Sequence, residues 1–388
     1  MAGSAPLSRP ILAGVVTALV GFTSSFAVVL TGLDAVGANA AQAASGLLAV
    51  SLTMGLACVV LAWRYRMPIT VAWSTPGAAL LVATGTVEGG WPAAVGAFLV
   101  TAVLILFTAL WPALGTLIAR IPPSIAQAML AGVLLPLCLA PITGMVANPW
   151  GVVPVVLTWL VCARFAPRWA VPLAFVAATV VVTVSLIGDG GKFSPGRLLP
   201  QLEFTAPTFT IGAVIGLALP LFIVTMASQN VPGIAIMRSF GYEVPWRPAM
   251  FVTGVGTALG ATAGGHAINL AAISAALAAS PDADPDPKRR WVAGVSTGVS
   301  YLVLGASSAA FATLVVLAPT AVIPAVAGLA LFAAFGSSVQ QAIQDPHERL
   351  PAVVTFLVAA SGIAVFGVSA AFWALVAGLL IRTTLHPR

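Results

Sequence analysis

The chain has 388 residues, of which 60% are hydrophobic and only 7% are charged. Soluble domains carry about 25% charged residues, so this composition excludes a soluble domain and indicates an integral membrane protein. The formal net charge is +6, but the basic residues are scattered singly and in pairs between apolar runs. That scatter excludes a nucleic-acid-binding patch and is typical of membrane topology signals.

Fourteen apolar segments are predicted to lie in the membrane. The first is long enough to span a bilayer and lacks a convincing cleavage site, so we expect a membrane segment and not a signal peptide. The predicted segments are residues 11–33, 40–63, 67–87, 92–118, 122–140, 149–163, 169–187, 207–231, 248–263, 265–280, 291–318, 320–340, 350–366 and 368–384.

The basic residues set the orientation of these segments. With the N-terminus inside, all 16 lysines and arginines except Lys192 and Arg197 fall on the cytoplasmic side, and a wrong count of spans would scramble this bias. Seven segments precede the loop 188–206 and seven follow it. Because seven is odd, the second half must enter the membrane from the opposite side. This pattern predicts an inverted repeat with both termini in the cytoplasm.

The third and tenth segments are interrupted. Residues 67–84 begin with a short extended run, after which Ser74 or Thr75 can cap a helix that has Pro76 in its first turn. Residues 266–280 follow a glycine pair and would form a helix of roughly 22 Å, too short for about 30 Å of hydrocarbon. Half-helices are tolerated there only where protein or water covers their ends, and their N-termini suit an anion. Two such segments in corresponding places indicate a transporter binding site.

His266 is the main candidate for a titrating group at depth. All ten acidic residues fall in predicted loops or at membrane edges, which leaves His266 as the only readily titratable polar side chain inside. An ionisable residue there is a functional candidate, and imidazole exchanges protons near physiological pH. The alternative is a neutral histidine that hydrogen-bonds between helices.

A polar triplet marks the eighth segment. Ser228, Gln229 and Asn230 are consecutive in an apolar helix, and Pro232 and Gly233 are predicted to break it. Amides and hydroxyls offer neutral donors to a carboxylate without the desolvation cost of a buried arginine. The alternative is hydrogen bonding between helices beside a helix end.

Phe22 and Phe26 in the first segment are spaced i, i+4 and share a helix face. The pair could sandwich a planar ligand, and an ordinary packed core explains the same spacing equally well.

Catalytic and nucleotide-binding motifs are not found in the sequence. The chain has no nucleotide-binding loop, no His/Glu or Cys cluster with catalytic metal spacing and no Gly-x-Ser-x-Gly elbow. We therefore expect neither ATP-driven transport nor an enzyme, and no cofactor or metal.

Three stretches resemble one family. Residues 72–79, 228–233 and 264–272 are similar to the signature stretches of the bacterial benzoate/proton symporter family, the benzoate membrane transporters, and the resemblance covers about residues 8–385. That family is similar in architecture to uracil permeases and, more distantly, to sulfate permeases.

The resemblance implies an all-α integral membrane protein with 14 transmembrane segments in a 7+7 inverted repeat, and short strands before the half-helices of segments 3 and 10. It also implies two domains that move against each other. The core domain would comprise residues 11–118 and 207–318, and the gate domain residues 122–187 and 320–384.

One departure bears on the substrate. Uracil permeases carry two glutamates where the matching motif positions here hold Gln229 and His266. Two buried carboxylates would repel an anion, whereas an amide and a histidine would accept one. The exchange favours an organic acid over a nucleobase.

The expected function is a secondary active transporter that imports benzoate, or a similar aromatic carboxylate, with a proton by an elevator-like movement of core against gate. The expected location is the bacterial inner membrane, in contact with lipid. A nucleobase or inorganic-anion transporter of the same fold and an anion channel stay as alternatives. The oligomeric state is open, with a homodimer as one candidate.

The carboxylate is expected to face the helix ends near Thr75 and Asn269, with the ring against apolar walls and the coupled proton on His266. The candidate substrate-binding residues are Gln229, His266, Ser228, Asn230, Asn269, Ser74, Thr75, Phe22 and Phe26.

Overall fold

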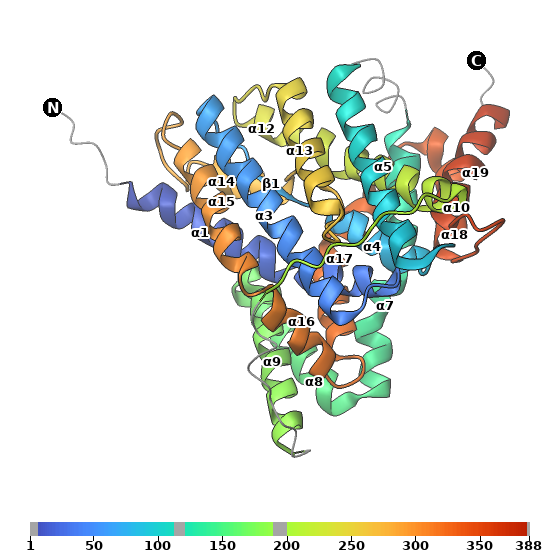
Figure 1. The fold of residues 1–388 in the computed structure, drawn as a ribbon, viewed down its shortest axis with the longest axis horizontal. Coiled ribbons are helices and arrows are strands. Elements are labelled where there is room, and N and C mark those ends of the chain that lie inside the picture. Colours follow the sequence, from blue (N-terminus) through green and yellow to red (C-terminus); the bar gives the residue numbers. More distant parts are fainter. Residues whose placement is uncertain (1–6, 112–120, 189–199, 386–388) are drawn as a thin grey trace.

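The structure is a computed structural model that describes residues 7–111, 121–188 and 200–385 (Figure 1). The end of the predicted fourth segment, 92–118, lies outside these residues. So do four basic residues that enter the charge bias, Arg120, Lys192, Arg197 and Arg388.

Helices form most of the described chain. They are α1 (Ser8–Thr23), α2 (Phe26–Ala35), α3 (Ala40–Tyr65), α4 (Thr75–Thr84), α5 (Gly90–Leu110), α7 (Pro123–Ala147), α8 (Pro149–Phe165), α9 (Ala170–Gly188), α10 (Ile211–Ala213), α11 (Leu219–Thr225), α12 (Val231–Ser239), α13 (Trp246–Ala261), α14 (Ile273–Ala279), α15 (Trp291–Gly305), α16 (Ser308–Leu317), α17 (Val322–Ala342), α18 (Arg349–Ala360) and α19 (Ala370–Leu385). Short 3-10 turns, η1 (Pro167–Trp169) and η5 (Pro346–Glu348), and π-helical turns, η3 (Val214–Ala218) and η4 (Met226–Asn230), complete the helical part.

The described residues contain seven helical stretches long and apolar enough to cross a membrane, or eight if the bent pair α15 and α16 counts as one span. The chain is thus a mostly helical, multi-pass membrane protein. The other predicted segments coincide with shorter helices, such as the 10-residue α4 and the 7-residue α14. The count of fourteen segments and the inverted repeat therefore stay predictions.

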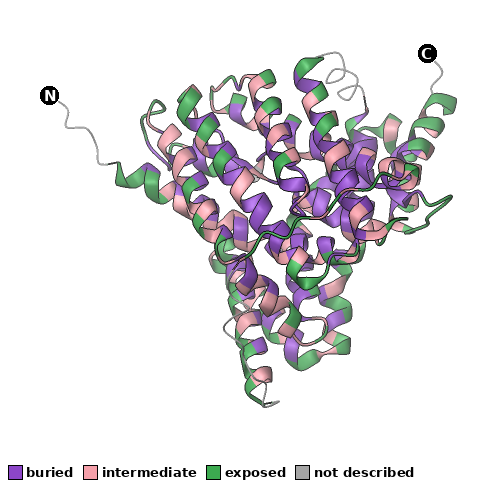
Figure 2. Ribbon diagram, in the orientation of Figure 1, coloured by how far each residue is buried: buried purple, intermediate pink, exposed green. Residues whose placement is uncertain are grey.

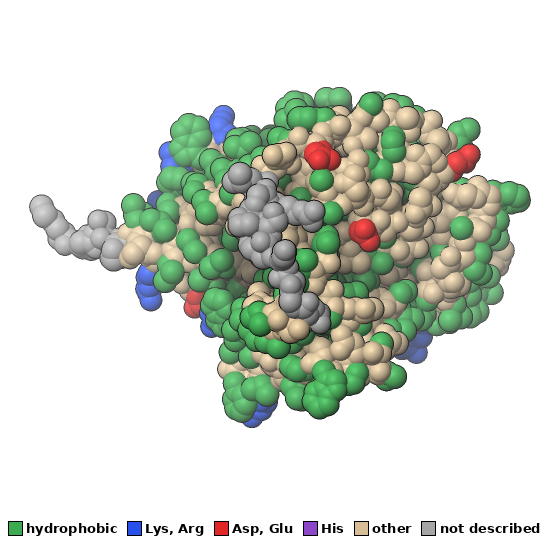
Figure 3. All heavy atoms as spheres, turned by 60° about the horizontal axis from the view of Figure 1, so that its bottom comes forward, with side chains coloured by type: hydrophobic (Ala, Val, Ile, Leu, Met, Phe, Trp, Pro, Cys, Tyr) green, Lys and Arg blue, Asp and Glu red, His purple; other side chains and the backbone are tan. Residues whose placement is uncertain are grey.

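The surface has the character expected next to lipid. Trp150 is 90% exposed and Val146 is 85% exposed, which would be costly in water. Figure 3 shows hydrophobic side chains spread over one face, with a few acidic groups on it and basic groups at its rim. The buried residues concentrate where the helices meet in the middle of the molecule (Figure 2).

Helix packing falls into two groups. One joins α1, α3, α5, α13 and α15, and the other joins α7, α8, α9, α17, α18 and α19. Each group takes elements from both halves of the chain. The division into a core and a gate domain, with the ranges given above, stays a prediction.

Small residues let the helices of the first group approach closely. A Cβ atom on Gly298 of α15 would lie 2.6 Å from the backbone carbonyl oxygen of Gly55 in α3. Since that oxygen is held by the α3 backbone, Gly298→Ala should lower the free energy of unfolding by about 1–3 kcal/mol. The melting temperature of the purified protein in detergent measures this effect.

Gly336→Ala in α17 is the matched control. Apart from the backbone of its own helix and its chain neighbours, no described atom lies within 4 Å of the Cβ that it would add, so this substitution should stabilise the helix by about 0.5–1 kcal/mol. Equal melting temperatures for the two variants would contradict a tight contact between α3 and α15.

The two interrupted segments meet at the centre of the molecule. Strand β1 (Val71–Trp73) pairs antiparallel with strand β2 (Ile268–Leu270), with Ala72 opposite Asn269. These strands form a two-stranded sheet, and α4 and α14 follow them in the chain. We call this meeting of β1 and β2 the crossing. It brings together residues nearly 200 positions apart in the sequence.

The helix predicted to begin at His266 is wrong, because residues 268–270 form β2 and α14 begins only at Ile273. Non-local partners hold this extended backbone. The Ile268 N–H donates to Thr257 Oγ1 at 3.1 Å, and the Ala271 N–H donates to the Thr70 carbonyl at 2.9 Å. A buried backbone that is satisfied in this way has no need of helical hydrogen bonds.

The predicted break at Pro232 and Gly233 is also wrong, since a helical stretch continues from Ile211 to Ser239. Proline disrupts a helix because it lacks an N–H and clashes with the preceding turn. Here the wider π-helical turn η4 comes directly before α12 and takes up the irregularity. Gly233 serves another purpose, because a Cβ there would lie 3.0 Å from the Ala271 carbonyl oxygen.

Candidate functional site at the crossing of the interrupted segments

Ser74 links β1 to α4 and is the N-cap of that helix. Its Oγ accepts a hydrogen bond from the Gly77 N–H at 3.1 Å and another from Thr225 Oγ1 at 3.0 Å. Its side chain is completely buried, while Thr75 is partly exposed. Of the two residues that the sequence offers as caps, Ser74 therefore fills the role, and Thr225 ties it to α11.

His266 is buried, with 1% of its surface exposed. Its Nε2 lies 3.2 Å from the Ser74 carbonyl oxygen. Because a carbonyl can only accept, this contact assigns the proton to Nε2 in the neutral ring. Nδ1 has no hydrogen-bond partner among the described residues. A buried unpartnered nitrogen is unusual and costly, and here it leaves one ring position for a ligand or a proton.

The polar triplet lies on the π-helical turn η4, and its members differ in what they touch. Ser228 Oγ is buried and has no hydrogen-bond partner in the described structure, and the Gln229 side chain is partly exposed. Asn230 is completely buried, and its Oδ1 accepts a hydrogen bond from the Leu270 N–H at 2.8 Å. Asn230 therefore holds β2 in place, whereas Ser228 and Gln229 keep polar atoms for another partner.

Asn269 lies in the middle of β2 and not at a helix N-terminus, which corrects the expectation for this residue. It is completely buried. With the amide oxygen turned toward Ser74, Asn269 accepts a hydrogen bond from the Ser74 N–H at 3.0 Å and donates to the Leu270 carbonyl at 2.8 Å. Its amide thus braces the two strands against each other.

Phe22 and Phe26 are completely buried, and their ring centroids are 6.1 Å apart. A planar ligand between them would need about 7 Å, which is two carbon–carbon contact distances of about 3.5 Å. Phe22 packs edge-on against Trp73, and Phe26 packs edge-on against Phe175. In this conformation the pair belongs to a packed aromatic cluster and leaves no slot for a ring.

Sequence reasoning missed a polar pair on a helix that packs against elements of the site. Helix α7 packs against both α4 and η4. Ser124 and Gln127 lie on its first turns and are nearly buried, at 5% and 7% exposure, and Ser124 Oγ has no hydrogen-bond partner in the described part of the chain. Polar residues in an apolar helix were the signal that singled out 228–230. The same signal at 124 and 127 could have identified this pair.

Three buried polar atoms on the crossing and on the elements packed against it lack partners in the described structure. His266 Nδ1 and Ser228 Oγ belong to segments predicted in the core domain, and Ser124 Oγ belongs to α7, predicted in the gate domain. The segments 67–84, 226–239 and 264–280 contain no acidic residue. Such a site can offer neutral or protonated donors to an anion and does not repel it with negative charge.

Comparison with known proteins gives one family. The family model described as benzoate membrane transport protein matches residues 5–384. The chain is 38% identical over 378 residues to the inner membrane protein YdcO of Escherichia coli, covering 97% of this chain and 95% of YdcO. It is 30% identical over 372 residues to the benzoate membrane transport protein of Acinetobacter baylyi, covering 95% of this chain and 93% of that protein.

Among solved structures, the fold is similar to the transmembrane domain of a cyanobacterial bicarbonate transporter, BicA. The TM-score is 0.60 with 15% identity over 96% of this chain and 97% of that one. It is also similar to the murine Solute Carrier 26 family member A9 anion transporter, with a TM-score of 0.58, 14% identity, and coverage of 97% and 68%. At such identities these likenesses establish the fold alone. The relatives named for an activity are transporters and not enzymes.

Proposed function

Since this chain belongs to the benzoate membrane transport protein family, we propose that it is a secondary active transporter that imports benzoate, or a similar aromatic carboxylate, together with a proton. The proposal places it in the bacterial inner membrane with both termini in the cytoplasm. A homodimer stays a prediction.

The observation that carries the proposal is the set of unpartnered polar atoms at the crossing of β1 and β2. A carboxylate needs donors, and His266 in its protonated form would supply an N–H from the free Nδ1. The Ser228 hydroxyl and the Gln229 amide, both on η4, add neutral donors. Hydrogen bonds to a charged ligand are the stronger kind, so a few well-placed donors suffice to fix its orientation.

Three of the remaining candidate residues hold the backbone of this site in place. Ser74 holds the start of α4, Asn230 and Asn269 hold β2, and Thr75 stands partly exposed at the first residue of α4. We assign Ser74, Asn230 and Asn269 to positioning, and His266, Gln229, Ser228 and Thr75 to substrate contact. This division is more specific than the set drawn from the sequence.

The transport step in this proposal is a displacement of the core domain against the gate domain. Ser124 and Gln127 on α7 would face the ligand from the gate side. Their contacts with the crossing would change as the core moves, because α7 belongs to the other packing group. A substrate held mainly by core residues would then be carried across the membrane.

An inorganic-anion transporter is the second candidate, because the fold is shared with a bicarbonate transporter. A screen in proteoliposomes separates the two. Radiolabelled benzoate uptake should be driven by an inward proton gradient and inhibited by unlabelled benzoate and substituted benzoates, and not by uracil, sulfate or bicarbonate. Inhibition by bicarbonate or sulfate alone would favour the second candidate.

Counterflow separates a carrier from a channel. Proteoliposomes preloaded with unlabelled benzoate should accumulate labelled benzoate transiently. A carrier that has brought unlabelled benzoate out can bind labelled benzoate outside and carry it in. Empty proteoliposomes, measured at the same external concentration, are the control. No acceleration by preloading would indicate a continuous pore and would overturn the carrier mechanism.

A further inference from the structure

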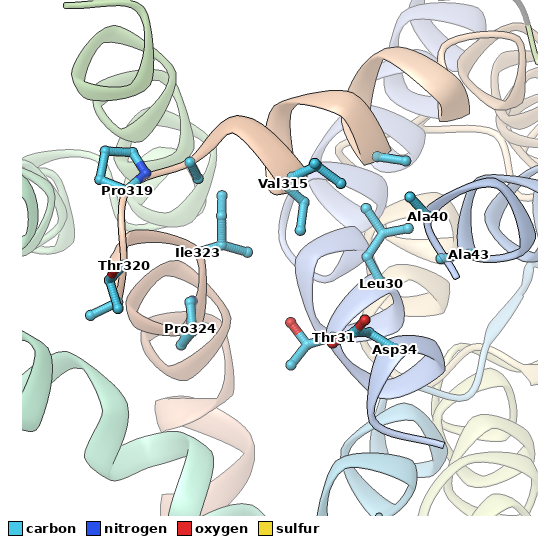
Figure 4. Close-up of a pocket in the computed structure, with 14 residues that line it drawn as sticks. Leu30, Thr31, Asp34, Ala40, Ala43, Val315, Pro319, Thr320, Ile323 and Pro324 are labelled. Carbon is cyan, nitrogen blue, oxygen red and sulfur yellow. The ribbon is translucent and has the colours of Figure 1, made fainter. Parts of the chain in front are cut away.

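A cavity of about 310 Å³ lies away from the crossing, between α2 and the connection from α16 to α17 (Figure 4). Its walls are mostly apolar, with the hydroxyl groups of Thr31 and Thr320 and the carboxylate of Asp34 as polar groups. In the proposed topology these ends of α2 and α16 face the outside. The cavity also lies between the two predicted domains, since α2 falls in the predicted core range and α17 in the predicted gate range.

The rings of Phe26, Phe175 and Phe311 pack against one another, and we call these three rings the aromatic layer. Phe26 is one helical turn before Leu30 in α2, and Phe311 is one turn before Val315 in α16; both Leu30 and Val315 line the cavity. The centroid of the Phe26 ring lies 4.6 Å from that of Phe311 and 4.6 Å from that of Phe175. Phe26 has no exposed surface. The layer is therefore a packed cluster one helical turn from residues that line the cavity.

The aromatic layer is connected to the candidate site on its other side. The Phe22 ring lies 5.4 Å from Phe311 and 5.0 Å from Trp73, measured between centroids. The Trp73 indole N–H donates to Ser25 Oγ at 2.9 Å. Trp73 is the last residue of β1, and the next residue, Ser74, contacts His266. A continuous series of contacts therefore leads from the aromatic layer to the crossing.

We propose that this cavity is an outer antechamber that receives the aromatic carboxylate, and that the aromatic layer is the barrier between the antechamber and the transport site. The inference rests on the proposed function for its ligand and its direction. Apolar walls suit a benzene ring. Asp34 is exposed, so water weakens its repulsion of an anion.

The composition of the layer explains how it could open. Phe26 and Phe311 lie on α2 and α16, predicted in the core, whereas Phe175 lies on α9, predicted in the gate. A displacement of one domain against the other separates the rings of one side from the ring of the other. The barrier is therefore coupled to the same movement that carries the substrate.

Cysteine labelling tests the barrier in right-side-out membrane vesicles, with a membrane-impermeant thiol reagent added outside. The native protein, with its three cysteines, gives the blank. Thr31→Cys in the antechamber should label, and benzoate should slow this labelling. Ser25→Cys beside Trp73 should label at least about tenfold more slowly, because a side chain beneath packed rings reacts only through local opening.

Removing one ring of the layer should expose Ser25→Cys. Phe311→Ala combined with Ser25→Cys is expected to raise the labelling rate toward that of Thr31→Cys. Phe332→Ala is the matched control, since Phe332 packs on Trp159 and, among the described residues, makes no ring contact with the layer. Phe311→Leu replaces Phe311→Ala if gel filtration shows that the alanine variant is not folded.

The outcomes separate the barrier from the function. Ser25→Cys that labels as fast as Thr31→Cys in the otherwise native protein would overturn the barrier, as would protection that persists in both Phe311 variants. Thr31→Cys that does not label from outside would overturn the antechamber. If the labelling pattern holds but benzoate neither protects Thr31→Cys nor is transported, the barrier stands and the proposed substrate fails.

Discussion

Gln229→Ala is expected to weaken benzoate binding about ten- to a hundredfold and to leave the fold intact. The side chain lies on the π-helical turn η4 and is partly exposed, so its removal leaves no buried group without a partner. Losing one hydrogen bond to a charged ligand costs about 1.5–3 kcal/mol, which corresponds to that change in affinity. Isothermal titration of the purified protein with benzoate measures the dissociation constant.

Asn230→Ala is the control from the neighbouring position. Asn230 accepts the Leu270 N–H, so its truncation leaves a buried donor unsatisfied and should cost about 1–3 kcal/mol of stability. We expect a lowered melting temperature for Asn230→Ala and an unchanged one for Gln229→Ala. A Gln229→Ala protein that melts and binds like the native one would place the substrate elsewhere.

The parts of the site that depend on local chemistry could be predicted from the sequence. Ser74 followed by Pro76 is a cap followed by a residue suited to the first helical turn, and the structure has that cap. Burial of His266 follows from its place in an apolar segment. The family also followed from the stretches 72–79, 228–233 and 264–272, which resemble the family's signature stretches and occur in the same order.

The errors arose where distant residues decide the local structure. Residues 266–270 look helical when considered alone, but β1, Thr257 and Asn230 satisfy their backbone in an extended form. The same non-local pairing places Asn269 in a strand. Pro232 normally ends a helix, and nothing in the local pattern signals that the π-helical turn before it will accommodate the ring.

The sequence also could not show which residues pack against Phe22 and Phe26. The spacing of Phe22 and Phe26 revealed a shared face but not what covers it. Phe311 and Phe175, far along the chain, complete the cluster and turn a possible ligand slot into a closed layer. Single-sequence patterns assign residues to faces, whereas the pairing of faces depends on the packing of the whole fold.

His266→Gln is expected to retain measurable benzoate binding and to lose accumulation driven by a pH gradient. An anion that enters a negatively charged cell works against the membrane potential, at about 2.3 kcal/mol per charge per 100 mV. One co-transported proton cancels that charge. A bound carboxylate would favour protonation of the free Nδ1, and by linkage the proton would favour the carboxylate to the same degree. Glutamine can still donate a hydrogen bond to the Ser74 carbonyl but cannot carry the proton.

Benzoate uptake into proteoliposomes with an imposed pH step measures this coupling, with binding measured separately on the same preparation. His347→Gln is the matched control, because it makes the same change at a histidine in the 3-10 turn η5 before α18, away from the crossing. This variant should accumulate benzoate like the native protein. If His266→Gln concentrates benzoate as well as the native protein, His266 does not carry the coupled proton. The proton would then have to travel on the substrate's own carboxylate or by way of Asp34, the only acidic residue that lines the antechamber in the described structure. Asp34→Asn in the His266→Gln background separates those two routes, since only the second would lose the remaining accumulation.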